Sequence, residues 1–273
     1  MRRTASGKEI RLDLDRRDDT VGGRLDIGSL TERAEEDAAV ADHYELRRYR
    51  LRNGSQARRL DEFLRDLAIP AMNRCGVQPV GVFLILLGDV TPSVYTLLRH
   101  PSLESVVAVR NRLAADAEYQ KAAAFFHDVP ATDPSFMRME NSVLVAFEGM
   151  PELEVPSEVQ GNRPRIFELR RYESHGEAAL RRKVAMFNGA EIAIFRRTGL
   201  RPVFFGETLI GPRQPNLTYM LTFESMAARE RSWAAFREDP EWRQLWSTPG
   251  LTDAEIVSNV TSTLLRPAPY SQI

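Results

Sequence analysis

The chain has 273 residues, of which 43% are hydrophobic and 27% are charged. With 37 basic and 38 acidic side chains, its formal net charge of −1 provides no long-range field to attract nucleic acid or an anionic membrane surface. The single cysteine, Cys75, excludes an internal disulfide, and no Cys/His pair has the spacing of zinc ligands. We therefore expect a cytoplasmic protein with no nucleic-acid partner, no membrane and no metal.

Residues 1–42 differ in composition from the rest of the chain. Of the first 40 residues, 18 are charged with both signs mixed, and no aromatic residue occurs among them. Such a segment has too little apolar surface to offset the entropy cost of ordering. We predict a disordered, charged N-terminal tail.

The next segment, residues 43–150, has alternating strand and helix patterns. Apolar residues recur at helical spacing after Asn53-Gly54-Ser55, and a turn at Gly88-Asp89-Val90-Thr91-Pro92 separates two β-rich runs. The predicted elements are a strand at 43–50, a helix ending at Gly76, strands at 77–87 and 94–98, a helix at 102–126 interrupted near Asp116, and a strand at 141–147. Their order is β-α-β-β-α-β.

The same order returns after a Pro- and Glu-rich linker at residues 151–164. Tyr44-Glu45-Leu46-Arg47-Arg48-Tyr49 recurs as Phe167-Glu168-Leu169-Arg170-Arg171-Tyr172, 123 residues later. The predicted elements of residues 165–273 are strands at 165–172, 201–210, 216–223 and 256–265 and helices at 176–197 and 225–246. One unit has therefore been duplicated, and the repeats are residues 43–150 and 165–273.

This element order predicts an α+β fold of two ferredoxin-like repeats. In each repeat both helices cover one face of a four-stranded antiparallel sheet, and the other face is bare. A duplicated unit can cover that face with its own copy, packed sheet to sheet. We therefore expect an intramolecular dimeric α/β barrel, and a homo-oligomer through the sheet edges stays open.

Several motifs, in the same order in both repeats, resemble the NIPSNAP family within the dimeric α/β-barrel superfamily. They are the hexapeptide above, the Gly-x-x-Pro-Val step after the first helix, and the stretch from Tyr219 to Trp242. The first repeat departs from the pattern where Val106 stands opposite Arg229. The resemblance implies a tandem barrel but brings no settled reaction.

Strand alternation separates each hexapeptide into two sets of side chains. We expect the more apolar set, which is Tyr44, Leu46 and Arg48 with their counterparts Phe167, Leu169 and Arg171, to contact the helices, and the other set to point into the space between the sheets. The predicted ligand-binding residues are Glu45, Arg47, Tyr49, Glu168, Arg170 and Tyr172, with the strand aromatics Phe83, Phe204 and Phe205. In that space, Glu is suited to act as a general base, Arg to bind a carboxylate and Tyr to donate a proton. The alternative is that these groups pair with one another and serve structure alone.

Three functions remain open from the sequence. The first is binding of a small, partly apolar organic molecule in the inter-sheet cavity. The second is a cofactor-independent monooxygenase, isomerase or cyclase, and the third is a non-catalytic scaffold with a filled barrel. No catalytic residue is assigned. No cofactor is expected, because phosphate-loop and dinucleotide-binding motifs are absent, although His100, His127 or His175 leaves haem as an alternative.

Overall fold

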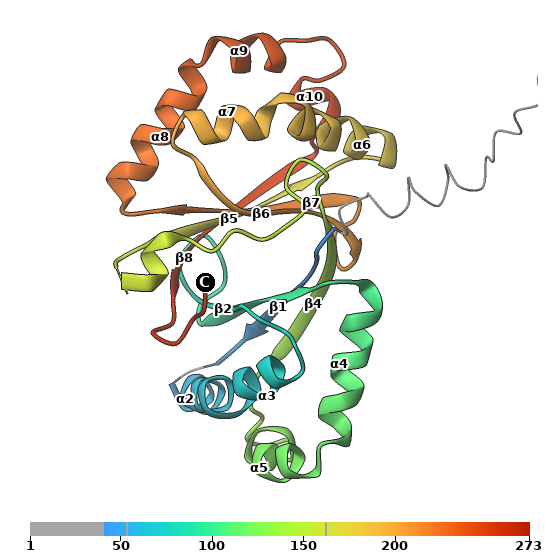
Figure 1. Ribbon diagram of the computed structural model, residues 1–273, viewed down its shortest axis with the longest axis vertical. Coiled ribbons are helices and arrows are strands. Elements are labelled where there is room, and N and C mark those ends of the chain that lie inside the picture. Colours follow the sequence, from blue (N-terminus) through green and yellow to red (C-terminus); the bar gives the residue numbers. More distant parts are fainter. Residues whose placement is uncertain (1–40, 53, 162) are drawn as a thin grey trace, which may run out of the picture. The chain divides into compact units, whose positions relative to one another are not determined.

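The fold is a closed eight-stranded barrel with helices packed on its outer side (Figure 1). This computed structural model describes residues 41–52, 54–161 and 163–273, which belong to one compact unit. The predicted N-terminal tail, apart from residues 41 and 42, lies outside the described residues. In the described part of the chain, no helix has both the length and the apolar character needed to cross a bilayer.

The first repeat has the predicted order, with both helices subdivided. Its elements are β1 (His43–Arg50), α2 (Gly54–Glu62), the π-helical η1 (Phe63–Ala68), α3 (Ile69–Arg74), β2 (Val80–Leu87), β3 (Ser93–His100), α4 (Leu103–Ala115), α5 (Ala117–His127) and β4 (Arg138–Ala146). The predicted break near Asp116 is confirmed, because its side chain accepts a hydrogen bond from the Tyr119 amide at 2.9 Å and caps α5.

The second repeat follows a short 3₁₀ helix, η2 (Ser157–Gly161). Its elements are β5 (Ile166–Glu173), α6 (Glu177–Met186), the π-helical η3 (Phe187–Glu191), α7 (Ile192–Arg197), β6 (Arg201–Ile210), β7 (Asn216–Phe223), α8 (Met226–Glu238), α9 (Pro240–Trp246), α10 (Asp253–Ile256) and β8 (Asn259–Pro267). The strands predicted at 201–210 and 216–223 are confirmed to the residue. Helix α10 was not predicted, although Thr252 and Glu255 form a capping box at its start.

The strand order confirms the predicted barrel. It runs β1-β3-β2-β8-β5-β7-β6-β4, and β4 returns to β1. Each repeat supplies four neighbouring strands, and the two sheets join through the pairs β2–β8 and β4–β6. Because this closure pairs the edge strands of both sheets within the chain, association through those edges, left open by the sequence, is not supported.

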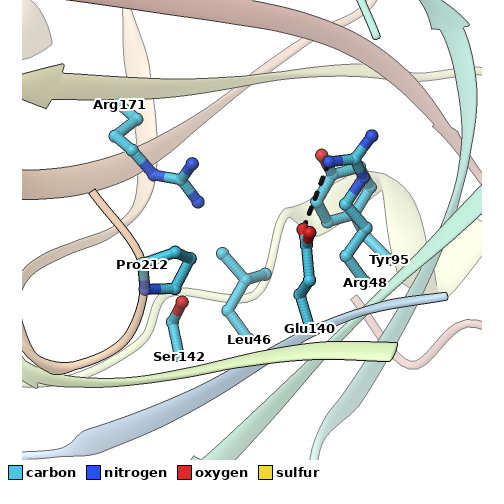
Figure 2. A pocket seen from close by; sticks show the side chains of 7 residues that line it. All are labelled: Leu46, Arg48, Tyr95, Glu140, Ser142, Arg171 and Pro212. Atoms are coloured by element: carbon cyan, nitrogen blue, oxygen red, sulfur yellow. Dashed lines mark hydrogen bonds and ion pairs between the residues drawn. The ribbon is translucent and has the colours of Figure 1, made fainter. Parts of the chain in front are cut away.

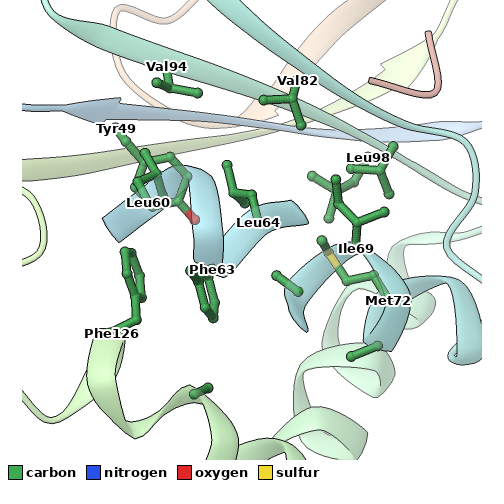
Figure 3. Packing of buried hydrophobic residues seen from close by; sticks show 14 of the residues in the cluster. Tyr49, Leu60, Phe63, Leu64, Ile69, Met72, Val82, Val94, Leu98 and Phe126 are labelled. Carbon is green, nitrogen blue, oxygen red and sulfur yellow. The ribbon is translucent and has the colours of Figure 1, made fainter. Parts of the chain in front are cut away.

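The barrel wall has two apolar layers. On the outer face of the first repeat, Tyr49, Val82, Val94 and Leu98 pack against α2, η1, α3 and α5 (Figure 3). A matching cluster lies beneath the helices of the second repeat. The inner faces of both sheets meet in a third cluster, which includes Leu46 from one repeat and Leu169 from the other. The bare faces therefore cover each other, as predicted.

Candidate ligand site at one end of the barrel

The structure reverses the predicted orientation of the repeated hexapeptides. Tyr44 and Leu46 belong to the inner cluster, whereas Tyr49 contacts the helices on the outer face. The prediction that Glu45, Arg47, Tyr49, Glu168, Arg170 and Tyr172 point into the inter-sheet space is therefore wrong. The closed barrel interior is the more apolar layer, whereas on the outer face these charges find partners on neighbouring strands in the first repeat and on a helix in the second.

On the outer face of the first repeat, Glu45 is held by several donors. Arg47 donates two hydrogen bonds to its carboxylate at 2.8 and 2.7 Å, and Asn141 donates another. The Nε2 atom of His100 lies 3.5 Å from Glu45 Oε2. Burial alone raises the pKa of Glu45, but His100, Arg47 and Asn141 outweigh it and lower the pKa to about 2.

The equivalent Glu168 accepts a hydrogen bond from Arg170 at 3.0 Å, as Glu45 does from Arg47, but its other partners differ. Arg229 donates two hydrogen bonds at 2.8 Å, and Trp233 and Ser262 donate one each at 2.8 and 2.7 Å. Burial raises the pKa of Glu168, but these donors and the charge of Arg170 lower it to about 2. A fully bonded carboxylate with so low a pKa is a poor general base. The structure therefore favours the structural alternative for both glutamates.

The predicted aromatic lining is divided between the two layers. Phe83 and Phe204 lie inside the barrel, where their rings pack 4.8 Å from Phe167 and 4.9 Å from Tyr44, respectively. Phe205 belongs to the outer cluster of the second repeat, because adjacent side chains of a strand point to opposite faces. All three are fully buried. Large side chains thus fill the middle of the barrel.

The end of the barrel that carries Arg48 and Arg171 is here called the arginine end, and Figure 2 shows side chains at this end. A pocket of about 20 Å³ lies there, with both repeats contributing to its wall. Its lining residues are Leu46, Arg48, Tyr95, Glu140, Ser142, Arg171 and Pro212. Gly211 lets the turn before β7 approach this pocket, since a Cβ atom at that position would lie 2.7 Å from Ser142 Oγ.

Arg48 is paired on two sides at the arginine end. Its guanidinium forms ion pairs with Asp89 at 2.5 Å and with Glu140 at 3.3 Å. The Tyr95 hydroxyl donates a hydrogen bond to Asp89, and burial together with this bond raises the pKa of Tyr95. Arg48 is therefore part of a closed network of charges.

Arg171 occupies the equivalent position in the second repeat but has no such network. Its side chain forms no hydrogen bond or ion pair with any residue that the structure describes. By sequence offset and strand register, the counterparts of Asp89, Tyr95 and Glu140 are Pro212, Thr218 and Thr261.

None of these replacements is anionic. Burial accordingly lowers the pKa of Arg171, with Tyr95, Glu173 and Glu140 acting against this effect and the charge of Arg213 adding to it. Figure 2 shows the Arg171 guanidinium pointing into the space above Pro212 and Ser142. The two repeats thus give one paired and one unpaired guanidinium at the same end of the barrel.

The sequence contained part of this signal. The 123-residue offset pairs Arg48 with Arg171 and Asp89 with Pro212, so the loss of one acidic partner was visible there. The loss of the other acidic partner, where Thr261 replaces Glu140, is visible only from the register of β4 and β8, because the 123-residue offset changes before these strands. Sequence reasoning missed the site because it assigned both arginines to the helix side.

Comparison with known proteins places the chain by sequence and by fold. The NIPSNAP family model matches twice, over residues 44–148 and 167–272. No curated protein matches. A putative monooxygenase from Lactobacillus acidophilus NCFM has a TM-score of 0.55 at 6% identity, covering 83% of this chain and 94% of that protein. This likeness supports the barrel fold alone.

Two structures related to single repeats were also found. An uncharacterized NIPSNAP-like domain protein from Burkholderia xenovorans is 24% identical, covering 38% of this chain and 85% of its own, with a TM-score of 0.34. A NIPSNAP family protein with unknown function from Agrobacterium tumefaciens str. C58 is 18% identical, covering 39% and 90%, with a TM-score of 0.35. Because the family model covers most of the sequence in two copies, the chain belongs to the NIPSNAP family.

Proposed function

We propose that this protein binds a small, partly apolar organic acid at the arginine end of its barrel, with Arg171 holding the anionic group. The observation that carries the proposal is the unpaired guanidinium of Arg171, beside an equivalent Arg48 that has two carboxylate partners. A planar guanidinium matches a carboxylate with two parallel hydrogen bonds. A bound acid would supply the charge that Pro212 and Thr261 do not.

The size of the pocket limits how such a ligand binds. A volume of about 20 Å³ accommodates roughly one water-sized group. The aromatic and aliphatic side chains of the inner cluster occupy the space beyond it. The anionic head therefore enters the barrel end, and the apolar part of the ligand remains at the mouth against Leu46 and Pro212.

The groups around the pocket support binding better than turnover. Glu140 is engaged by Arg48, and the Tyr95 hydroxyl is engaged by Asp89. A general acid or base needs a proton that it can exchange with the substrate, and neither group is free to do so. The filled interior favours a second candidate function, in which the barrel is a scaffold that holds no ligand.

Titration with benzoate distinguishes the two candidates, with benzyl alcohol as the uncharged probe of the same ring size. Benzoate should shift the NMR signals of residues at the arginine end, and Arg171→Met should weaken its binding by roughly 10- to 100-fold. This range corresponds to about 1.5–3 kcal/mol for hydrogen bonds to a charged group. No shift at millimolar benzoate, or equal binding by Arg171→Met, would contradict the proposal and favour the scaffold.

A further inference from the structure

Exposed apolar side chains gather at the arginine end of the barrel. Strands β2 and β6 end there in the turns that carry Asp89 and Pro212, and β4 and β8 begin there, beside the last residues of β1 and β5. Of the fourteen large apolar side chains that are exposed in the described part of the chain, eight lie on these strand ends or in the adjoining loops. We call them the apolar rim, and they are Leu86, Leu87, Val90, Met137, Met139, Leu209, Ile210 and Val260.

The apolar rim is present in both repeats. Leu87 corresponds to Ile210 by the 123-residue offset, and Met139 corresponds to Val260 by strand register. Leu87 is 67% exposed and Ile210 is 59% exposed, so neither packs in the core. Single exposed apolar residues are normal on a protein surface, whereas a group of them gathered at one place marks an interaction surface. The rim therefore indicates that something covers this end of the barrel.

Two arginines at the same end stand opposite each other without an anion. Arg50 is the last residue of β1, Arg138 is the first residue of β4, and the strand register pairs them directly. Like charges directly opposite each other destabilise an antiparallel pair. Neither side chain forms a hydrogen bond or ion pair with a residue that the structure describes. In the second repeat the equivalent residues are Glu173 and Asn259, which share a hydrogen bond of 3.1 Å.

The arginine end as a whole is positively charged. Its carboxylates are already engaged, Asp89 and Glu140 by Arg48 and Glu173 by Arg213. The expectation of no membrane partner rested on the net charge of the whole chain, which does not exclude a local cationic surface. The strand ends and turns carry five guanidiniums against these three carboxylates, a local balance of +2, and the five are Arg48, Arg50, Arg138, Arg171 and Arg213.

Apolar side chains beside unpaired arginines match the chemistry of an anionic lipid surface. The apolar groups can enter the boundary between headgroups and acyl chains, and the guanidiniums can contact the lipid phosphates. A second copy of this chain, docked through the same end, would instead bring the arginines of two chains together, which their like charges oppose.

We infer that the arginine end docks on an anionic lipid bilayer, with the apolar rim in the interface and with Arg50 and Arg138 on the lipid phosphates. The exposed rim, its presence in both repeats and the opposed arginines support this partner together. The inference does not depend on the proposed ligand of Arg171, because it rests on other residues and is tested without that ligand.

Flotation of the full-length chain with vesicles tests this inference. The chain should float with vesicles of phosphatidylglycerol mixed with phosphatidylcholine and not with phosphatidylcholine alone, and added salt should weaken the binding. Arg138→Gln should weaken binding about fivefold, which corresponds to about 1 kcal/mol for one arginine near an anionic surface. Ile210→Ser should weaken it by a similar factor or more, because an exposed apolar side chain no longer enters the interface.

Two matched control variants lie on α4, outside the rim. Arg110→Gln removes another exposed arginine that has no ion pair with a described residue, and Val107→Ser removes an apolar side chain that is 59% exposed, as Ile210 is. Both should bind the vesicles as wild type does. The inference is overturned if the chain does not float with anionic vesicles, or if the rim variants bind no more weakly than the control variants.

Discussion

Replacing Arg48 and Arg171 separately by Met separates a structural arginine from a ligand-binding one. The two residues are equivalent in the repeats, and Met keeps much of the apolar stem while removing the charge. Arg48→Met leaves Asp89 and Glu140 without their shared cation. Arg171→Met removes no hydrogen bond or ion pair to a residue that the structure describes.

The expected loss for Arg48→Met is about 2–3 kcal/mol of unfolding free energy. Breaking a fully buried ion pair by removing one partner costs roughly 3–5 kcal/mol. The loss here is smaller because Asp89 keeps hydrogen bonds from Tyr95 and the Val90 amide, and Glu140 is one-third exposed. For Arg171→Met we expect a change within about 0.5 kcal/mol of wild type, or a small gain.

Urea unfolding followed by tryptophan fluorescence measures both values. The unfolding free energy comes from linear extrapolation, and an unchanged slope shows that the substitution has not altered the surface exposed on unfolding. Equal destabilisation by the two substitutions would refute the inference that Arg171 is unpaired. A loss of more than about 1 kcal/mol in Arg171→Met would point to a structural role instead.

The remaining predictions concern buried charges of the second repeat. Lys183 and Glu191 form a buried ion pair of 3.2 Å where the first repeat has Leu60 and Ala68. Lys183→Leu should lower the free energy of unfolding by about 3–5 kcal/mol, because Glu191 is left buried without its cation. The double variant with Glu191→Ala should regain most of this free energy, and a double variant that is no more stable than Lys183→Leu in urea unfolding would contradict the prediction. The pKa of Glu168 is about 2, below its ordinary 4.5, so its contribution to stability is complete above pH 4.5 and is lost as the pH falls toward 2. The urea midpoint of wild type should therefore fall more steeply over this range than that of Glu168→Gln, and parallel curves would count against the low pKa.

The fold could be predicted from the sequence because duplication repeats every local signal. The hexapeptide and the turn glycines keep a constant offset, so an uncertain element in one repeat is supported by its copy in the other. Asp116 is followed by a helix that it caps, and the break it causes could be placed from the sequence; Asp239 caps α9 in the same way in the second repeat. Helix α10 could not, because its four residues carry no periodicity.

The site could be predicted only in part, because a strand pattern gives two faces without saying which is inside. Leu46 and Arg48 share one face with Tyr44, and Glu45 shares the other with Tyr49; either set is compatible with a helix layer. The helix residues Arg229 and Trp233 decide the matter by bonding to Glu168, and these contacts span 61 and 65 residues of sequence. The repeated motif therefore placed these residues on two equivalent strands but did not show which way their side chains point.

The most direct measurement of the proposed function is a crystal structure with 4-bromobenzoate, in which anomalous scattering locates the bromine. We expect the carboxylate to contact the Arg171 guanidinium and the bromine to lie outside the barrel end, near Leu46 and Pro212. The same soak with Arg171→Met should show no bromine at this position. Bromine bound equally in both crystals, or only beside Arg48, would contradict the assignment of Arg171 as the group that holds the ligand.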